Sequence, residues 1–119
     1  MPVYLDNAAT SWPKPPVLIA AMQDFLQNCG GSPGRSGHGK SLASARIVYE
    51  TRDLLATLFN APSAERVVFT KNATEAINIV LFGFLNPGDH VVVSSMEHNA
   101  VMRPLRELEK RGIELSIIQ

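Results

Sequence analysis

Short apolar segments alternate with helical patterns in the second half of the chain, and this alternation constrains the fold more than any other feature. Residues 66–70, 90–94 and 113–118 are short and rich in β-branched or aromatic side chains, which is typical of buried strands. Between them, residues 73–85 and 100–110 place apolar side chains at helical spacing. The order strand, helix, strand, helix, strand predicts an α/β fold with a mainly parallel sheet flanked by helices and joined by right-handed crossovers.

The helix predicted at residues 73–85 begins with a candidate anion site. Asn72, followed three residues later by Glu75, resembles a capping box, which places the unpaired amides of the first helical turn at residues 73–76. Those amides and the positive end of the helix dipole attract phosphate, and the Thr74 hydroxyl can add a hydrogen bond. The alternative interpretation is that Asn72 and Thr74 only cap an ordinary helix.

The strand predicted at residues 90–94 also ends in polar groups, among them Glu97 and His98. Ligands of parallel sheets bind outside the carboxyl ends of the strands, so we expect His98 opposite the phosphate cradle. There it can stack on a planar ligand or move a proton near neutral pH. The alternative is a surface histidine without a functional role. We keep that interpretation for His90, which lies at the start of its strand.

Pro104 is expected in or near the first turn of the following helix, because deeper in the helix it removes a backbone hydrogen bond.

The first half of the chain is predicted to hold two helices behind an extended arm. Residues 1–15 are rich in proline and polar side chains and form the arm. Apolar side chains at helical spacing predict amphipathic helices at residues 16–28 and 41–59. Gly30 and Gly31 end the first helix, and residues 60–62, Asn-Ala-Pro, end the second.

The segment between these helices, residues 30–40, has glycine at 30, 31, 34, 37 and 39 and is too poor in apolar groups for regular structure. Something must pin such a loop. It is either a connector or a loop that bends tightly to deliver Arg35, Ser36 and His38 to a site.

The composition argues against two classes of partner. The 119 residues carry 11 basic and 11 acidic side chains without a run of Lys or Arg, so the electrostatic footprint of a nucleic-acid or anionic-membrane binder is missing. The N-terminus lacks a signal pattern, and no apolar run approaches the ~18 residues of a membrane span. Cys29 has no disulfide partner within the chain, which favours a reducing, cytoplasmic compartment.

Four blocks of the sequence, in their order and spacing, resemble the class V aminotransferase family of pyridoxal-phosphate enzymes, and within it the cysteine desulfurase-like proteins. The blocks are YLDNAAT at residues 4–10, GSPGRSGH at 31–38, VFTKNATEAIN at 68–78 and SMEHNA at 95–100. The resemblance implies the N-terminal part of the large domain of a fold-type I transferase that depends on pyridoxal 5'-phosphate. Residues 1–15 would be its arm and residues 16–119 an incomplete large domain.

The resemblance also implies roles for individual residues. Ala73 and Thr74 fall where the family grips the cofactor phosphate, in agreement with the helix-terminus argument. His98 falls where the family stacks an imidazole on the pyridine ring, and where it helps proton transfers. Residues expected to border the active site near the substrate are Asn7, Ala8, Arg35 and His38, the last two in a loop that reaches toward a second subunit of a homodimer. No metal ligand is implied.

The chain departs from the family in two motifs. In the family a lysine forms a Schiff base with the cofactor and an aspartate pairs with the pyridinium nitrogen. Lysine occurs only at 14, 40, 71 and 110, never after Ser-x-His, and no aspartate follows a strand as that partner should. The family's catalytic cysteine and its substrate-carboxylate arginine come from later sequence, so Cys29 is not expected to carry sulfur. We expect the N-terminal third of such an enzyme, inactive and prone to self-association when alone.

Taken together, the sequence predicts part of a pyridoxal-phosphate enzyme that cleaves the carbon–sulfur bond of cysteine, leaving alanine and an enzyme persulfide. Selenocysteine or another amino acid stays open as the substrate. One alternative is a non-catalytic remnant or interaction module that keeps the fold. A nucleotide binder is disfavoured, because neither G-x-G-x-x-G nor G-x-x-x-x-G-K-[ST] follows a predicted strand.

Overall fold

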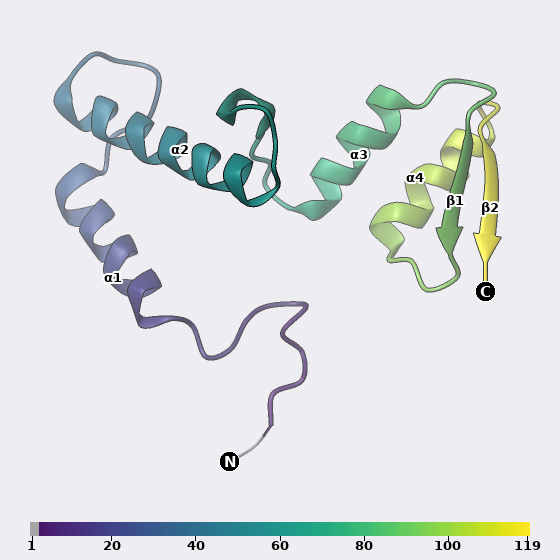
Figure 1. The fold of residues 1–119 in the computed structure, drawn as a ribbon, viewed down its shortest axis with the longest axis horizontal. Coiled ribbons are helices and arrows are strands. Elements are labelled where there is room, and N and C mark those ends of the chain that lie inside the picture. The colour runs from purple at the N-terminus through teal and green to yellow at the C-terminus, as the bar shows by residue number, and fades with distance from the viewer. Residues whose placement is uncertain (1–2) are drawn as a thin grey trace. The chain divides into compact units, whose positions relative to one another are not determined.

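Residues 3–119 are described by a computed structural model, and the chain divides into two units after Val67 (Figure 1). The first unit holds α1 (Pro16–Asp24), α2 (Gly39–Leu58) and a short 3-10 turn. The second holds, in order, α3 (Ala73–Phe84), β1 (His90–Ser94), α4 (Asn99–Glu109) and β2 (Glu114–Ile118).

The first predicted helix is confirmed, with an irregular end. α1 begins at Pro16, whose fixed φ and missing N–H suit the first helical position. It continues into a π-helical turn, Phe25–Cys29, and Gly30 ends it in the left-handed region at φ 57°. The Gly30 amide donates to the carbonyl of Phe25 at 2.9 Å, which closes the wider turn.

α2 begins two residues before its predicted start and ends where the Asn-Ala-Pro signal places its end. Asn60 takes a left-handed conformation at φ 53°. Its amide donates to the Thr57 carbonyl at 3.3 Å, and the Ala61 amide donates to the Ala56 carbonyl at 2.8 Å. This pair of bonds is a Schellman motif, in which asparagine replaces the usual glycine.

The glycine-rich loop is held against the start of α2. The Ser41 hydroxyl, which is 1% exposed, donates to the Ser32 carbonyl at 2.8 Å. A Cβ on Gly31 would lie 2.7 Å from the carbonyl carbon and oxygen of Lys40, so only glycine allows the two backbones to approach this closely. The loop is therefore pinned at its N-terminal side, as its composition requires.

The second unit is built on a parallel pair of strands. β1 and β2 run side by side and parallel (Figure 1). In their register, His90 lies opposite Glu114. The turns before the two strands are also joined, because the amide of Gly88 donates to the carbonyl of Gly112 at 2.8 Å. Both glycines have positive φ, 94° and 92°. The predicted strands at 90–94 and 113–118 are thus confirmed.

α4 supplies most of the core of this unit. Leu105, Leu108 and Ile113 are buried. Partly buried apolar side chains that surround them come from α3 and its C-cap residue, from both strands and from α4 itself: Leu81, Leu85, Val91, Val93, Val101 and Leu115. α3 packs against α4, yet no residue of α3 is buried. The parallel sheet flanked by helices confirms the predicted α/β fold class.

Two local predictions are wrong. Arg66 closes a 3-10 turn, Ala64–Arg66, and residues 67–70 form no strand within residues 3–119, because the ladder that defines a strand needs a neighbouring strand. Pro104 lies in the second turn of α4 and not in or near the first. It therefore offers no N–H to the carbonyl of Ala100, and its ring is buried.

Candidate active site

The start of α3 carries the predicted cap. Oδ1 of Asn72 accepts a hydrogen bond from the Glu75 amide at 2.9 Å. Oε2 of Glu75 reaches back to the amide of Lys71 at 2.7 Å, one residue before the donor of a standard capping box. Two donors that precede or open the helix are thus satisfied by a reciprocal pair of side chains.

Two backbone amides in the first turn of α3 have no hydrogen-bond acceptor within the described residues. The Glu75 amide bonds the Asn72 side chain, and the Ala76 amide bonds the Asn72 carbonyl at 3.2 Å. Within residues 3–119, neither the amides of Ala73 and Thr74 nor the Thr74 hydroxyl makes a hydrogen bond. The predicted anion site at residues 73–76 therefore narrows to the first two amides and one hydroxyl, at the positive end of the helix dipole.

His98 is the N-cap residue of α4. Its Nδ1 accepts a hydrogen bond from the Ala100 amide at 3.0 Å, and its carbonyl accepts from the Val101 amide at 2.8 Å. The neighbouring carboxylate of Glu97 is engaged elsewhere, because it accepts from the Ser94 hydroxyl at 3.0 Å. A backbone amide, and not the adjacent carboxylate, therefore orients the imidazole.

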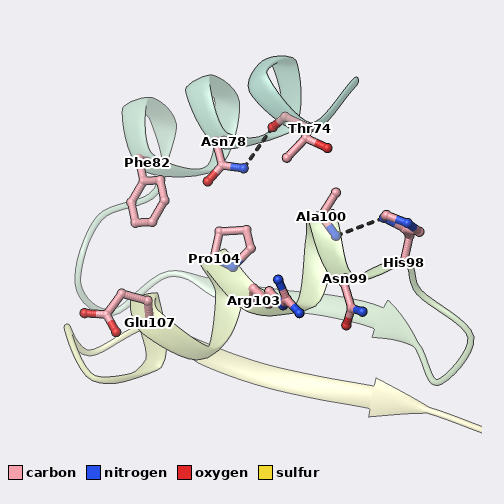
Figure 2. A pocket seen from close by; sticks show the side chains of 9 residues that line it. All are labelled: Thr74, Asn78, Phe82, His98, Asn99, Ala100, Arg103, Pro104 and Glu107. Atoms are coloured by element: carbon pink, nitrogen blue, oxygen red, sulfur yellow. Dashed lines mark hydrogen bonds between the residues drawn. The ribbon is translucent and has the colours of Figure 1, made fainter. Parts of the chain in front are cut away.

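Thr74 and His98 line one cavity of about 420 Å³ between α3 and α4 (Figure 2). Its walls are Thr74, Asn78, Phe82, His98, Asn99, Ala100, Arg103, Pro104 and Glu107. Figure 2 shows the side chains of Asn78 and Phe82 extending from α3 toward α4. The structure thus brings together two of the three residues assigned to the cofactor, and the third, Ala73, directly precedes Thr74.

The charges around the cavity are unequal at its two ends. The open amides of α3 make the Thr74 end positive, and the Arg103 guanidinium adds a positive charge to the lining. At Glu107 a hydrogen bond from Nζ of Lys110, 2.8 Å long, lowers the pKa of the carboxyl. Glu107 is thus ionised at neutral pH and paired with Lys110. An anion is favoured at the Thr74 end.

The cavity also contains residues that the sequence analysis did not single out, notably Asn78, Phe82 and Arg103. The signal was present. Thr74, Asn78 and Phe82 are spaced by four residues and so share one face of α3. Our periodicity argument followed the apolar stripe of the helix and left this mixed stripe unassigned.

The predicted substrate-proximal residues lie in the first unit. Asn7 stabilises a turn of the N-terminal arm: its Oδ1 accepts from the Trp12 amide at 3.1 Å, and its Nδ2 donates to the Tyr4 carbonyl at 3.4 Å. Ala8 lies in the same turn and is exposed. Arg35 is exposed in the glycine-rich loop.

His38 has a structural role of its own, because its Nδ1 accepts from the Ser41 amide at 3.2 Å and caps α2. The approach of Asn7, Ala8, Arg35 and His38 to a substrate stays a prediction.

Two further searches of the described chain bear on the class of site. Residues 3–119 contain no group of three or more His, Cys, Asp or Glu side chains placed to hold a metal ion. Among the helices of this same range, none is long and apolar enough to cross a membrane.

The relatives found by comparison with known sequences include cysteine desulfurases. The chain is 36% identical over 118 residues to a probable cysteine desulfurase of Methanothermobacter thermautotrophicus. This match covers 98% of this chain and 29% of the length of the relative. It is likewise 36% identical over 119 residues to a cysteine desulfurase of Serratia proteamaculans, with 96% of this chain and 29% of the relative covered. The chain thus spans less than a third of the length of these relatives.

Solved structures agree in fold. The apo cysteine desulfurase of Thermococcus onnurineus NA1 matches 98% of this chain and 30% of its own length, with 30% identity and a TM-score of 0.84. The cysteine desulfurase CsdA of Escherichia coli matches 96% of this chain and 30% of its own length, with 33% identity and a TM-score of 0.70. The fold is that of the N-terminal part of the large domain of a fold-type I transferase. The family model for aminotransferase class-V matches residues 3–119, and the chain therefore belongs to the class V aminotransferase family.

Proposed function

We propose that this chain supplies the phosphate- and ring-contacting part of a pyridoxal 5'-phosphate site in a cysteine desulfurase-like enzyme. The observation that carries the proposal is one cavity of the second unit, which Thr74 and His98 line from two different elements. Two amides at the start of α3 have no acceptor within the described residues and lie at the same end. When bound, pyridoxal phosphate supplies the electron sink for cleavage at the bound amino acid.

The residues present fit such a ligand. The amides of Ala73 and Thr74 and the Thr74 hydroxyl offer three donors to a phosphate, at the helix end where the dipole favours an anion. A cavity of about 420 Å³ is of the size that holds small ligands. The imidazole of His98 offers a planar face for a ring, and the Ala100 amide fixes its orientation.

The chain's own contributions to the reaction are binding and orientation. Asn72 sets the start of α3 and thereby which amides face the phosphate. His98 holds the ring of the cofactor and carries the one imidazole proton in the cavity lining. Asn7, Ala8, Arg35 and His38 border the substrate in this proposal, and residues 1–15 serve as an arm ahead of the large domain at 16–119.

For the whole enzyme we propose the activity in the names of its relatives. Cysteine is the substrate, alanine is one product, and the sulfur stays on the enzyme as a persulfide. The protein works in the cytoplasm as a homodimer. In a protein of the relatives' length, additional sequence supplies the lysine that binds the cofactor and the cysteine that accepts sulfur.

Binding of pyridoxal phosphate tests the proposal directly. Equilibrium dialysis of the protein with pyridoxal phosphate should show saturable binding, with inorganic phosphate as a competitor. Thr74→Ala should weaken binding by about 1–2 kcal/mol, the scale of a hydrogen bond to a charged group, or about 5- to 30-fold. His98→Ala should change the absorbance of the bound cofactor. Thr57→Ala, an exposed threonine of α2, is the matched control and should leave binding unchanged.

Alanine release from cysteine is measured separately. Saturable binding with no turnover in the full-length protein would favour the alternative of a non-catalytic module that keeps the fold. Equal affinity in the wild type and Thr74→Ala would remove the start of α3 from the site.

A further inference from the structure

The hydrogen bond between Ala100 and His98 assigns the ring proton of the histidine. A backbone amide can only donate, so Nδ1 of His98 must present its lone pair across the 3.0 Å contact. In a neutral imidazole the single ring proton then lies on Nε2. Figure 2 shows this bond at the edge of the cavity, with the rest of the ring free of other drawn contacts.

The usual arrangement in catalytic histidines has the opposite polarity. There a carboxylate accepts a hydrogen bond from the Nδ1–H, and Nε2 is left with the lone pair that acts as a base. The adjacent carboxylate, Glu97, could have played this part, but it accepts from Ser94. Glu107, the acidic residue of the cavity lining, is paired with Lys110. In the described chain no carboxylate bonds His98.

We propose that the amide of Ala100 is a positioning group that fixes the Nε2–H tautomer of His98. His98 then meets the ligand of this cavity as a hydrogen-bond donor and a stacking ring, and it has no free lone pair with which to act as a base. To accept a proton, the ring must take it at Nδ1, and this breaks the bond to Ala100 and removes the cap of α4. The identity of the ligand rests on the proposed function; the tautomer does not.

Nitrogen chemical shifts of the imidazole rings test the tautomer. In protein labelled with ¹⁵N-histidine at about pH 8, above the ordinary histidine pKa of about 6.5, Nδ1 of His98 should show the shift of an unprotonated nitrogen. Nε2 should show the shift of an N–H. His38 is the internal control, because its Nδ1 accepts from the Ser41 amide and it must show the same pattern. A proton on Nδ1 of His98, or an average of the two tautomers, would overturn the proposal.

Two substitutions of His98 distinguish the role of its imidazole ring toward the ligand from its role as the N-cap of α4. Asparagine is a strong N-cap residue and can accept from the Ala100 amide without offering an imidazole. His98→Asn should therefore unfold at the denaturant concentration of the wild type, whereas His98→Ala should unfold earlier. Both should change the absorbance of bound pyridoxal phosphate equally. If His98→Asn keeps the wild-type absorbance, the ring of His98 does not contact the cofactor and that part of the proposed function fails. The tautomer is decided by the nitrogen shifts alone.

The outcomes also separate this inference from the proposed function. A protein that binds no pyridoxal phosphate but shows the Nε2–H tautomer would contradict the proposed function and support the positioning role of Ala100. A protein that binds the cofactor with His98 protonated on Nδ1 would support the proposed function and contradict the positioning role of Ala100.

Discussion

Oδ1 of Asn72 and the amide of Glu75 lie 2.9 Å apart in a hydrogen bond, and this contact decides which amides of α3 remain open to a ligand. Asn72→Ala should lower the free energy of unfolding by about 1 kcal/mol, the usual cost of a lost N-cap. Asn72→Asp should keep the cap but place a negative charge beside the amides of Ala73 and Thr74. Urea unfolding and pyridoxal phosphate binding should be measured on both variants. We expect Asn72→Asp to unfold at nearly the same urea concentration as the wild type but to bind pyridoxal phosphate clearly more weakly. Wild-type cofactor affinity in Asn72→Asp would argue that no anion binds at this helix end.

Two buried serines of α2 should respond differently to the same substitution. Ser41 is 1% exposed and bonds the Ser32 carbonyl, so Ser41→Ala should cost about 1–3 kcal/mol through the lost bond and the unsatisfied carbonyl. Ser44 is 2% exposed, and its hydroxyl finds no partner in the described part of the chain. Ser44→Ala should therefore be neutral or stabilising. Equilibrium unfolding in urea compares the two, and equal losses in both variants would contradict the hydrogen-bond assignment.

The glycine-rich loop offers a pair of substitutions that test its close approach to α2. Gly31→Ala would bring Cβ within 2.7 Å of the Lys40 backbone, and we expect a loss of about 1–3 kcal/mol as the two backbones move apart. A Cβ on Gly37 meets nothing within 4 Å, so Gly37→Ala should be tolerated. Thermal unfolding of both variants is the measurement. A stable Gly31→Ala protein would show that the loop is not pinned there.

Acid should weaken the segment between α2 and α3 through Glu65. A hydrogen bond from the Ser63 side chain is the main cause that lowers the pKa of this carboxyl, with a smaller contribution from the charge of Arg52. Because the pKa is lower in the folded state, the stabilisation is present above the ordinary glutamate pKa and is lost as the pH falls through the folded value. Ser63→Ala should therefore be less stable than the wild type at pH 7, and the difference should shrink as the pH falls below the ordinary glutamate pKa. A difference that does not depend on pH would contradict this linkage.

Local signals in the sequence predicted much of the fold. Asn72 marks the start of α3, and Gly30 and Asn60 mark the ends of the preceding helices, because caps are decided by neighbouring backbone groups and leave a short-range pattern. The strands β1 and β2 were predicted from their β-branched side chains. Their pairing partners lie within the described chain, so the pattern was sufficient.

Other features depend on groups that a local pattern does not contain. Residues 67–70 have the composition of a strand, but pairing decides whether a strand forms. The caps formed by His38 and His98 escaped prediction because imidazole is not among the common N-cap residues. The pairing of Thr74 with His98 in one cavity was expected from the topology of parallel sheets. The mixed stripe of Asn78 and Phe82 was not, because only packing against α4 gives it a role.

The hydrogen bond between Gly88 and Gly112 has a consequence for the order in which the chain folds. It closes a loop of roughly 25 residues that contains β1 and α4, and a loop of this length has a small closure entropy compared with pairings across a whole domain. We expect this segment to form early, with Leu105 and Leu108 collapsing onto the strands as the turns meet. Pulse-labelled hydrogen exchange should then show β1 and β2 protected before α2, and protection of α2 at the same time as the strands would contradict this order.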